Sequence, residues 1–333
     1  MRVTIKDIAK LADVSVTTAS MALNNKKGVN EETRLKVLNI SKELDYHPNK
    51  NARSLKTYKT LTIGLIVPEI TNPYFASIVE CIRKEFENLG YTLLFGVSGD
   101  EIKNEQKYVF EFIERNVEGI IIVPTNAVIA DLSHLYYLKR IKMPFIFLAT
   151  KYEGIPANCV MTDLYNGSYL ITKHLLENGH EKIFMITVDR RLLTSNMRLN
   201  GYMDAFRDMK KKYKDEWIYE TLPDFEHGYE ASQKIIQKKP DAIITINDIL
   251  AFGVLKFLKD IKIKVPEEIS VAGYDDIIFA SISETPLTTV RQPIESICAK
   301  AVELILKEIR CEELTSEIYY FKPELKIRDS TRQ

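Results

Sequence analysis

The sequence has little of several features that define particular classes of protein. Its four cysteines are far apart in 333 residues, and no two of them have the Cys-x-x-Cys spacing of a redox or zinc motif. Scattered cysteines of this kind indicate reduced thiols in the cell interior. No run of about 18 apolar residues exists, and the chain begins with charged residues. We therefore expect a cytoplasmic protein with neither a membrane span nor an export signal.

Signatures of common catalytic sites are also missing. The five histidines show no His-Glu-x-x-His pattern, and neither a Gly-x-Ser-x-Gly elbow nor a phosphate-binding Walker A loop occurs. The adjacent carboxylates Asp275 and Asp276 end a predicted strand, in which neighbouring side chains point to opposite faces, so we do not expect a catalytic dyad. The sequence therefore predicts no enzyme, no metal site and no cofactor.

The net charge of zero hides an asymmetry along the chain. Residues 1–60 hold 12 Lys/Arg and 6 Asp/Glu, a net charge of +6, whereas residues 61–333 hold the other 34 basic and 40 acidic residues, a net charge of −6. A basic head on an acidic body indicates that the head binds a polyanion. On charge alone, a merely solvated basic segment is an equal alternative.

The N-terminal segment has the spacing of three short helices. Thr4 opens a capping box, Asp13 falls at a turn that often needs left-handed backbone, and Ser15 is a natural N-cap. A second helix is expected at about Val16–Asn24, and a third begins after Asn30. These helices predict a helix-turn-helix unit, for which a generic helical hairpin is the alternative.

Two features of this segment favour DNA as its partner. The outer face of the second helix carries Thr17, Thr18, Ser20 and Asn24, whose short polar side chains can approach base edges and phosphates. A basic helix then follows the break at His47-Pro48, and its only large apolar residue is Leu55. Leu55 is either a linker leucine packed on the body or a wedge inserted between base steps of the minor groove.

Five segments of the chain match a known pattern: TIKDIAKLADVS, TTASMALN, VNEETRLKVL, ELDYHPNKNARSLKT and TIGLIVPEITNPYF. They resemble the headpiece, the hinge helix and the first strand of the LacI/GalR family of transcriptional regulators. The resemblance implies that the second helix lies in the major groove, that hinge helices of a dimer pair in the minor groove, and that the hinge leucine intercalates. It assigns DNA contacts to Thr4, Ser15, Val16, Thr17, Thr18, Ser20, Met21, Asn24, Asn49, Ala52 and Leu55.

Met21 departs from the family pattern, because many members carry an arginine at this place. Arginine reads guanine with two hydrogen bonds, whereas methionine offers only apolar contact, for instance to a thymine methyl group. Methionine can also pack back on the headpiece. The sequence therefore predicts a half-site that lacks the family's usual G·C pair at one position.

The rest of the chain alternates between strand and helix patterns. This repetition predicts parallel sheets covered by helices, and a second series that starts near Asp163 implies two Rossmann-like lobes. The resemblance adds that the body is like periplasmic binding proteins and that the chain recrosses between the lobes. We expect an α/β fold with an all-α helix-turn-helix headpiece. The predicted parts are the headpiece (1–47), the hinge helix (48–60), and an effector-binding and dimerisation domain (61–333), with lobe 1 at about 61–160 and 291–320 and lobe 2 at about 161–290 and 321–333.

Polar residues follow several of the predicted strands, where open α/β sheets bind their ligands. Arg198, at the start of a predicted helix, Asn247 and Asp275 suit a polyhydroxylated solute, since guanidinium and carboxylate groups each bind vicinal hydroxyls. Tyr74 and Phe75 suit the apolar face of a sugar. The alternatives are that the polar residues only cap helices and that the aromatic residues belong to the core.

The resemblance places Arg198, Asn247, Asp275 and the residues of Asn-Pro-Tyr-Phe in the effector pocket. Ala149 stands where many members have an acidic residue, which removes one sugar contact. The loop before Phe225 is shorter than usual, so we do not assign Phe225 to the pocket.

These observations predict a homodimeric transcriptional repressor of carbohydrate-utilisation genes. Two heads related by a two-fold axis would read a pseudo-palindromic operator in double-stranded DNA. A small-molecule effector, a sugar or sugar derivative, would bind between the lobes and control DNA binding. The alternatives are the same scaffold with a nucleobase-type corepressor and a ligand-binding protein without a DNA role.

Overall fold

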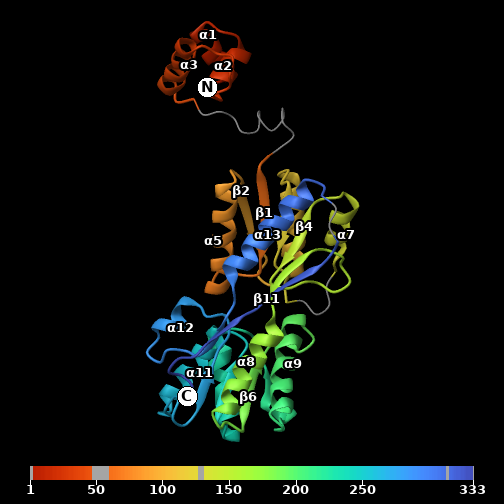
Figure 1. Cartoon of the computed structure of the whole chain (residues 1–333), viewed down its shortest axis with the longest axis vertical. Helices are drawn as coiled ribbons and strands as arrows, with labels where there is room; N and C mark the ends of the chain where they lie inside the picture. The colour runs from red at the N-terminus through yellow and green to blue at the C-terminus, as the bar shows by residue number, and fades with distance from the viewer. Residues whose placement is uncertain (1–2, 47–59, 127–130, 313–314, 333) are drawn as a thin grey trace. The chain divides into compact units, whose positions relative to one another are not determined.

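The computed structural model of the chain describes residues 3–46, 60–126, 131–312 and 315–332. Contacts divide the chain into two compact units, Met1–Thr60 and Leu61–Gln333. We call them the headpiece and the body (Figure 1). In the described part of the chain, no helix is both long enough and apolar enough to cross a membrane.

The described part of the headpiece contains three short helices: α1 (Ile5–Ala12), α2 (Val16–Leu23) and α3 (Glu31–Glu43). The predicted caps are confirmed. Thr4 and Asp7 form the capping box of α1, Ser15 accepts a hydrogen bond from the Thr18 N–H, and Asp13 has the left-handed φ of 55°. Because side-chain oxygens satisfy the first N–H groups of these helices, short sequences can hold helical structure here.

The core of the headpiece is small and built from small residues. Its buried members are Ile8, Ala9, Ala12, Ala19, Ala22 and Val37. The alanines let α1 and α2 approach closely. This core leaves the polar side of α2 exposed to solvent.

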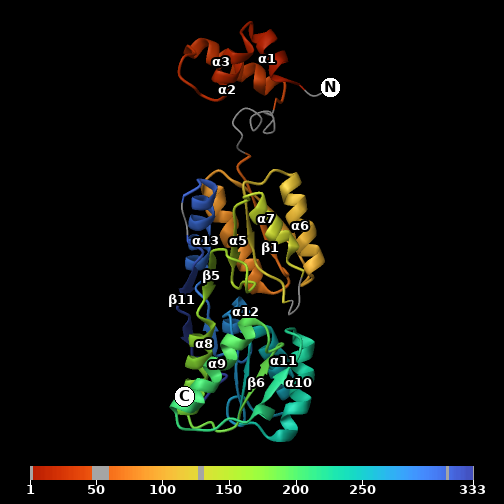
Figure 2. The ribbon, with the colours of Figure 1, turned by 90° about the vertical axis from the view of Figure 1, so that its right-hand side faces the viewer.

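Lobe 1 of the body is a six-stranded parallel sheet in the order β11-β5-β4-β3-β1-β2. Its strands are β1 (Thr62–Val67), β2 (Thr92–Val97), β3 (Gly119–Ile122), β4 (Phe145–Leu148), β5 (Cys159–Thr162) and β11 (Ile318–Phe321). The helices that cover it are α5 (Pro73–Asn88), α6 (Ile102–Glu114), α7 (Ser133–Arg140) and α13 (Ile294–Ile309). Figure 2 shows α13 and α6 on opposite sides of this sheet.

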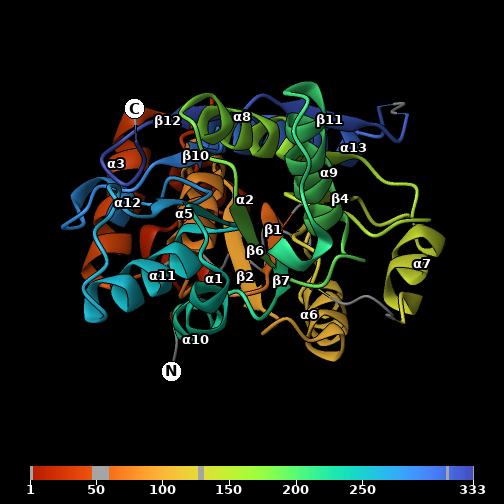
Figure 3. The ribbon, with the colours of Figure 1, turned by 90° about the horizontal axis from the view of Figure 1, so that it is seen from below.

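Lobe 2 is a four-stranded parallel sheet in the order β7-β6-β8-β9. Its strands are β6 (Ile183–Thr187), β7 (Ile218–Glu220), β8 (Ala242–Thr245) and β9 (Ser270–Ala272). Its helices are α8 (Leu164–Glu177), α9 (Leu193–Asp208), α10 (Phe225–Ile235), α11 (Asp248–Asp260) and the short α12 (Ile278–Ile282). Figure 3 shows α8 and α9 on one side of the sheet and α10 and α11 on the other.

Helices α10 and α11 pack closely because glycine lies at their crossing. A Cβ atom at Gly253 would lie 2.1 Å from the Phe225 carbonyl oxygen, so any larger residue would force the two helices apart. This packing fixes the start of α11, which carries residues that face lobe 1.

Three connections join the two lobes, as the recrossing prediction requires. The chain leaves lobe 1 after β5, returns to it after β10 (Thr289–Arg291), and leaves it again after β11 through β12 (Glu324–Lys326). Strands β10 and β12 pair with each other in antiparallel fashion. The last residues then complete lobe 2, where the Ser330 hydroxyl donates to the Val271 carbonyl oxygen over 2.6 Å.

Two sequence predictions need correction. The helix predicted to start near Arg198 begins at Leu193, so Arg198 lies in its second turn and not at its start. Asp275 and Asp276 are not on an extended strand, because β9 ends at Ala272 and both residues have positive φ values of 109° and 56°. Strands β5 and β11 and helix α12 are short. Hydrophobic spacing in the sequence does not distinguish elements of this length from the residues around them.

Candidate functional site

The exposed side of α2 is the first candidate site, and its side chains differ in how they are held. Val16 and Thr17 are exposed, and Ser20 is half-buried. The Thr18 hydroxyl is held 2.8 Å from the Ser15 hydroxyl at the cap, and the Asn24 side-chain amide donates to the Ser20 carbonyl oxygen over 2.8 Å. Val16, Thr17 and Ser20 are therefore the freest of the predicted DNA-contact residues on this helix.

Thr4 is exposed, and its hydroxyl donates to the Asp7 carboxylate over 2.7 Å. Thr4 is thus held in the capping box of α1, and its DNA contact stays a prediction. The predicted DNA contacts of Asn49, Ala52 and Leu55 lie outside the described residues.

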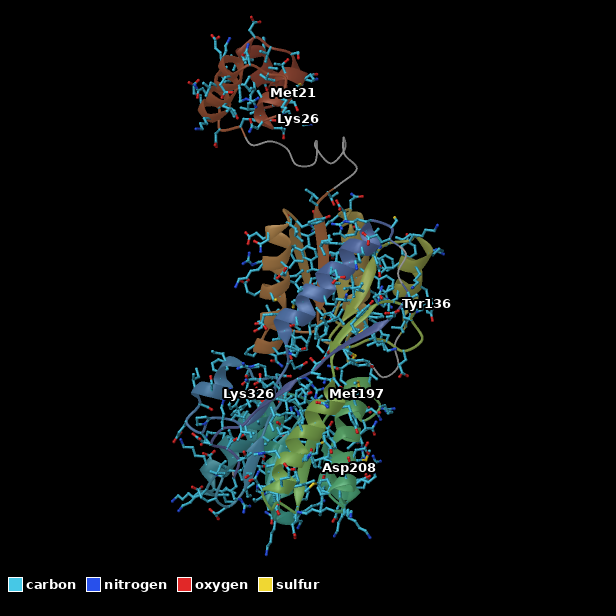
Figure 4. The ribbon with its side chains drawn as sticks, in the orientation of Figure 1. Met21, Lys26, Tyr136, Met197, Asp208 and Lys326 are labelled. Atoms are coloured by element: carbon cyan, nitrogen blue, oxygen red, sulfur yellow. The ribbon has the colours of Figure 1, made fainter. Side chains whose placement is uncertain are left out.

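Met21 is half-buried, and its methyl group lies over the loop that follows α2. A Cβ atom at Gly28, whose φ is +103°, would lie only 3.0 Å from the Met21 Cε atom. The side chain thus packs back on the headpiece, near the end where Lys26 also lies (Figure 4). The packed arrangement is one of the two that the sequence left open, and it keeps the sulfur and methyl group at the edge of the exposed face.

A cavity between the two lobes is the second candidate site, and its empty space together with the solvent at its open mouth is about 730 Å³. All five residues that were predicted to bind an effector line it: Tyr74, Phe75, Arg198, Asn247 and Asp275. Lobe 1 contributes the start of α5 and the ends of β3 and β4, and lobe 2 contributes α9 and the ends of β8 and β9. Open α/β sheets bind ligands beyond the carboxyl ends of their strands. Here residues at the strand ends of both lobes line the same cavity.

Arg198 presents unsatisfied hydrogen-bonding capacity to the cavity. Only 8% of the residue is exposed, and its guanidinium carbon lies 4.3 Å from the centre of the Tyr274 ring. Its Nη1 atom donates to the Thr194 carbonyl oxygen over 3.4 Å, whereas its Nε atom is buried without a partner among the described residues. A guanidinium group has five N–H donors, so Arg198 retains donors for a ligand acceptor beside its hydrogen bond to Thr194.

Asp275 lines the same cavity as Arg198. Its carboxylate accepts a hydrogen bond of 2.7 Å from the Gln292 side-chain amide, and the Gln292 oxygen accepts one of 3.1 Å from the Tyr74 hydroxyl. Burial raises the pKa of Asp275 to about 7, although the Arg198 charge and the Gln292 hydrogen bond oppose that rise. The carboxyl group is thus poised to ionise near neutral pH.

Asn247 serves both as a helix cap and as a wall of the cavity. Its side-chain oxygen accepts a hydrogen bond of 2.8 Å from the Leu250 N–H, and its amide donates to the Pro223 carbonyl oxygen over 2.9 Å. The amide has a second hydrogen and the oxygen a second lone pair. Capping and ligand contact, which the sequence treated as alternatives, are therefore compatible.

The two departures from the family pattern occupy different places. Ala149 lines the cavity with a left-handed φ of 64°, so a methyl group stands where a carboxylate would offer a hydrogen bond. Phe225 begins α10, is 38% exposed and does not line the cavity.

Asp276 turns away from Asp275 and pairs with Arg291 over 2.6 Å and with Arg328 over 2.5 Å.

Several polar residues of the cavity escaped the sequence prediction: Glu69, Asn126, Thr150, Thr194 and Gln292. Glu69, Asn126 and Thr150 follow strands of lobe 1, so the strand-end rule could have found them. Gln292 gave no such signal, because it lies on the segment that recrosses to lobe 1 and meets Asp275 only through the tertiary fold.

Comparison with known proteins identifies this combination of headpiece and body. Residues 4–49 match the model of the lacI family of bacterial regulatory proteins, and residues 60–324 match that of periplasmic binding proteins and the sugar binding domain of the LacI family. The chain belongs to the LacI family. It is a DNA-binding transcriptional repressor with the helix-turn-helix headpiece and two-lobed body of that family.

Relatives of this LacI-family chain match it along nearly its whole length. It is 31% identical to the HTH-type transcriptional repressor PurR of Vibrio vulnificus, with 99% of both chains covered. It is 33% identical to PurR of Aliivibrio fischeri, with 98% of both chains covered.

Solved structures show the same fold. The Lac repressor dimer bound to operator and the anti-inducer ONPF has a TM-score of 0.88 at 23% identity over 99% of both chains. A LacI-family regulator of Enterococcus faecium with bound ribose has a TM-score of 0.73 at 28% identity, covering 81% of this chain and 98% of that one.

Proposed function

We propose that this repressor binds a pseudo-palindromic operator as a homodimer in the cytoplasm, and that an effector held between its lobes controls this binding. Two features support the proposal. The polar side of α2 is exposed on a headpiece with net positive charge, and the interlobe cavity carries both a guanidinium group and a carboxyl group. The genes that the operator controls would be those of carbohydrate utilisation.

The effector that suits the cavity best is a sugar or a sugar derivative. One observation carries this choice: the guanidinium group of Arg198 and the carboxyl group of Asp275 belong to one cavity, where they can bind vicinal hydroxyls as donor and acceptor. Phe75, half-buried in the same cavity, offers an apolar wall to the sugar ring. The related regulator with bound ribose supports the same class of ligand.

A nucleobase-type corepressor is the second candidate. The wall formed by Val123, Pro124 and Ala149 is apolar, since Ala149 has no carboxylate, and it suits a flat ring as well as a sugar face. A base would still use the amide and carboxyl groups of Asn247 and Asp275. Calorimetry with matched sugar and base panels separates the two candidates.

We propose that control is transmitted by the relative position of the lobes. An effector that contacts Arg198 and Asn247 in lobe 2 and Phe75 in lobe 1 stabilises one orientation of the lobes over another. Coupling of about 1–3 kcal/mol between such sites is typical and changes DNA affinity by roughly 5- to 150-fold.

We also propose that the ligand is bound without chemical turnover. A hydrolytic mechanism needs a second reactive group beside Asp275. The neighbouring carboxylate of Asp276 is instead neutralised by Arg291 and Arg328. This pairing supports a binding site and not a catalytic one.

Arg198→Ala tests the pocket. We expect loss of the effector response with unchanged effector-free operator affinity, because the substitution removes a donor from the cavity and leaves the headpiece intact. Thermal-shift screening against sugars, sugar phosphates and nucleobases identifies a ligand, since binding to the folded state raises Tm. Titration calorimetry and fluorescence anisotropy on labelled operator then measure the two affinities.

Arg190→Ala is the matched control for this experiment. Arg190 lies in the same lobe but pairs with Asp215 and Glu220 outside the cavity. Its variant should keep the effector response. Normal ligand affinity in Arg198→Ala would show that the pocket assignment is wrong.

A further inference from the structure

Two cysteines from distant parts of the sequence meet between two helices of lobe 1. Cys81 lies on α5 and Cys298 on α13, and these helices pack together on the same side of the sheet (Figure 1). Cys298 is fully buried in the apolar cluster, whereas Cys81 is half-buried at the edge of that cluster.

Two observations place the sulfur atoms side by side. The Cys298 thiol lowers the pKa of Cys81, and the Cys81 thiol raises the pKa of Cys298, as side chains within reach of each other do. Independently, the Cys298 Sγ atom lies 4.0 Å from the carbonyl oxygen of Ile78, three residues before Cys81. A helical side chain leans back over the preceding turn, so the space beside the Ile78 carbonyl is the space that the Cys81 side chain reaches.

The two thiols differ in reactivity. The Cys298 thiol lowers the pKa of Cys81 and the charge of Lys84 does so too, against the opposing effects of burial and of Glu295 and Glu85. The Cys81 thiol and burial raise the pKa of Cys298. Because the thiolate is the nucleophile, Cys81 is the residue that reacts first and Cys298 the one that follows.

We propose that Cys81 and Cys298 are a site of reversible oxidation, at which hydrogen peroxide converts the two thiols into a disulfide bond within one subunit. The Cys81 thiolate attacks one peroxide oxygen, the O–O bond breaks, and hydroxide leaves, which produces a sulfenic acid. The Cys298 sulfur then attacks the Cys81 sulfur, and the sulfenic oxygen leaves as water with the Cys298 proton. Two electrons pass from the thiols to the peroxide, and a dithiol reductant reverses the reaction.

The position of the pair connects it to the cavity, and this consequence rests on the proposed function. Helix α5 begins with Tyr74 and Phe75, which line the cavity, and α13 follows Gln292, which binds Asp275. A covalent bond between the two helices fixes these two parts of the cavity wall relative to each other. We therefore expect oxidation to change effector affinity by at least threefold.

The test uses the reduced full-length protein treated with hydrogen peroxide. Remaining thiols are alkylated, and peptides are mapped by mass spectrometry without reductant. We expect a peptide pair linked through Cys81 and Cys298 that dithiothreitol separates. The Cys159→Ser/Cys311→Ser double variant should keep this link, because burial raises the pKa of Cys159 to about 12 and Cys311 lies outside the pair.

Three results would overturn the proposal. The first is a disulfide bond between the Cys81 residues of two subunits, and the second is irreversible oxidation of Cys81 without a disulfide bond. The third is equal oxidation of Cys81 in wild type and in Cys298→Ser, with no disulfide bond in either protein. Peptide mapping needs neither operator nor effector, so its failure is distinct from failure of the proposed function. If oxidised and reduced wild type bind the effector with equal affinity, the coupling to the cavity is contradicted. Cys81→Ser treated with peroxide is the control, because it cannot form the disulfide bond.

Discussion

Met21 is predicted to face one base pair of the half-site, and its side chain also packs beside Gly28 of the headpiece. Methionine has no donor for guanine, whereas an arginine there can make two hydrogen bonds to guanine O6 and N7. We expect Met21→Arg to shift the preference at one half-site position toward G·C, with a discrimination of about 1–3 kcal/mol. Selection of sites from a random DNA pool, compared between wild type and variant, measures this shift.

The added positive charge in Met21→Arg raises affinity for all sequences, so the readout is base preference and not affinity. Lys26→Arg, in the exposed loop after α2, is the control for a new guanidinium group at the same end of the headpiece. An unchanged preference in Met21→Arg would show that position 21 does not face a base.

We predict that Asp275 makes effector binding depend on pH. Burial raises its pKa from 3.8 to about 7, so in the effector-free protein the carboxyl group is mostly protonated below that pH. Ligand hydroxyls that donate to the carboxylate favour its ionised form. We expect effector affinity measured by calorimetry to rise with pH up to about 7 and to level off above it, by at most about tenfold per pH unit.

The same shift affects stability with the opposite sign. Because the folded state holds the Asp275 proton more tightly than the unfolded state, this group lowers the free energy of unfolding as pH rises from about 4 to 7. Asp275→Asn should remove both effects. A pH-independent effector affinity in wild type would contradict a ligand contact with this carboxylate.

Among the elements, α2 depends strongly on its cap, because its eight residues contribute only Ala19 and Ala22 to the fully buried core. Ser15→Ala removes the hydrogen bond of 3.0 Å from the Thr18 N–H. We expect a loss of about 1 kcal/mol in local stability. Native-state hydrogen exchange of the α2 amides in the full-length protein measures it, and protection equal to that of the exposed-site variant Thr17→Ala would contradict the role of the cap.

The helices of the headpiece could be predicted from sequence because their determinants are local. Ser15 and Asn30 lie immediately before the helices they cap, and Asp13 tolerates the left-handed turn between them. No contact with the rest of the fold is needed to recognise these signals.

The interlobe cavity was only partly predictable. Arg198, Asn247 and Asp275 came from strand-end chemistry and from the family pattern. The Gln292 contact with Asp275 joins residues 17 apart across β10, and the positive φ values of Asp275 and Asp276 follow from tertiary packing. Hydrophobic periodicity carries no information on either feature.

At the scale of the whole molecule, headpiece and body are separate compact units, and their functions should be separable. We expect a chain of residues 61–333 to dimerise and to bind effector but to lose operator affinity at every salt concentration. Full-length protein should lose affinity as salt rises, because each neutralised phosphate contributes a slope of about −0.9 in log K against log salt.

Sedimentation and anisotropy measurements on both proteins test this separation. Operator binding by residues 61–333 would refute the assignment of DNA reading to the headpiece. A monomeric body would instead assign dimerisation to residues before Leu61.

The completion of lobe 2 by the last residues of the chain has a consequence for synthesis. Ser330 and Arg332 bind backbone and side-chain groups of β9, and Thr331 binds Thr288. While these residues are still inside the ribosome, their hydrogen bonds to lobe 2 cannot form, yet the headpiece has already emerged and can fold as a unit. Each newly made chain therefore carries a folded reading head before it has a complete ligand-sensing body.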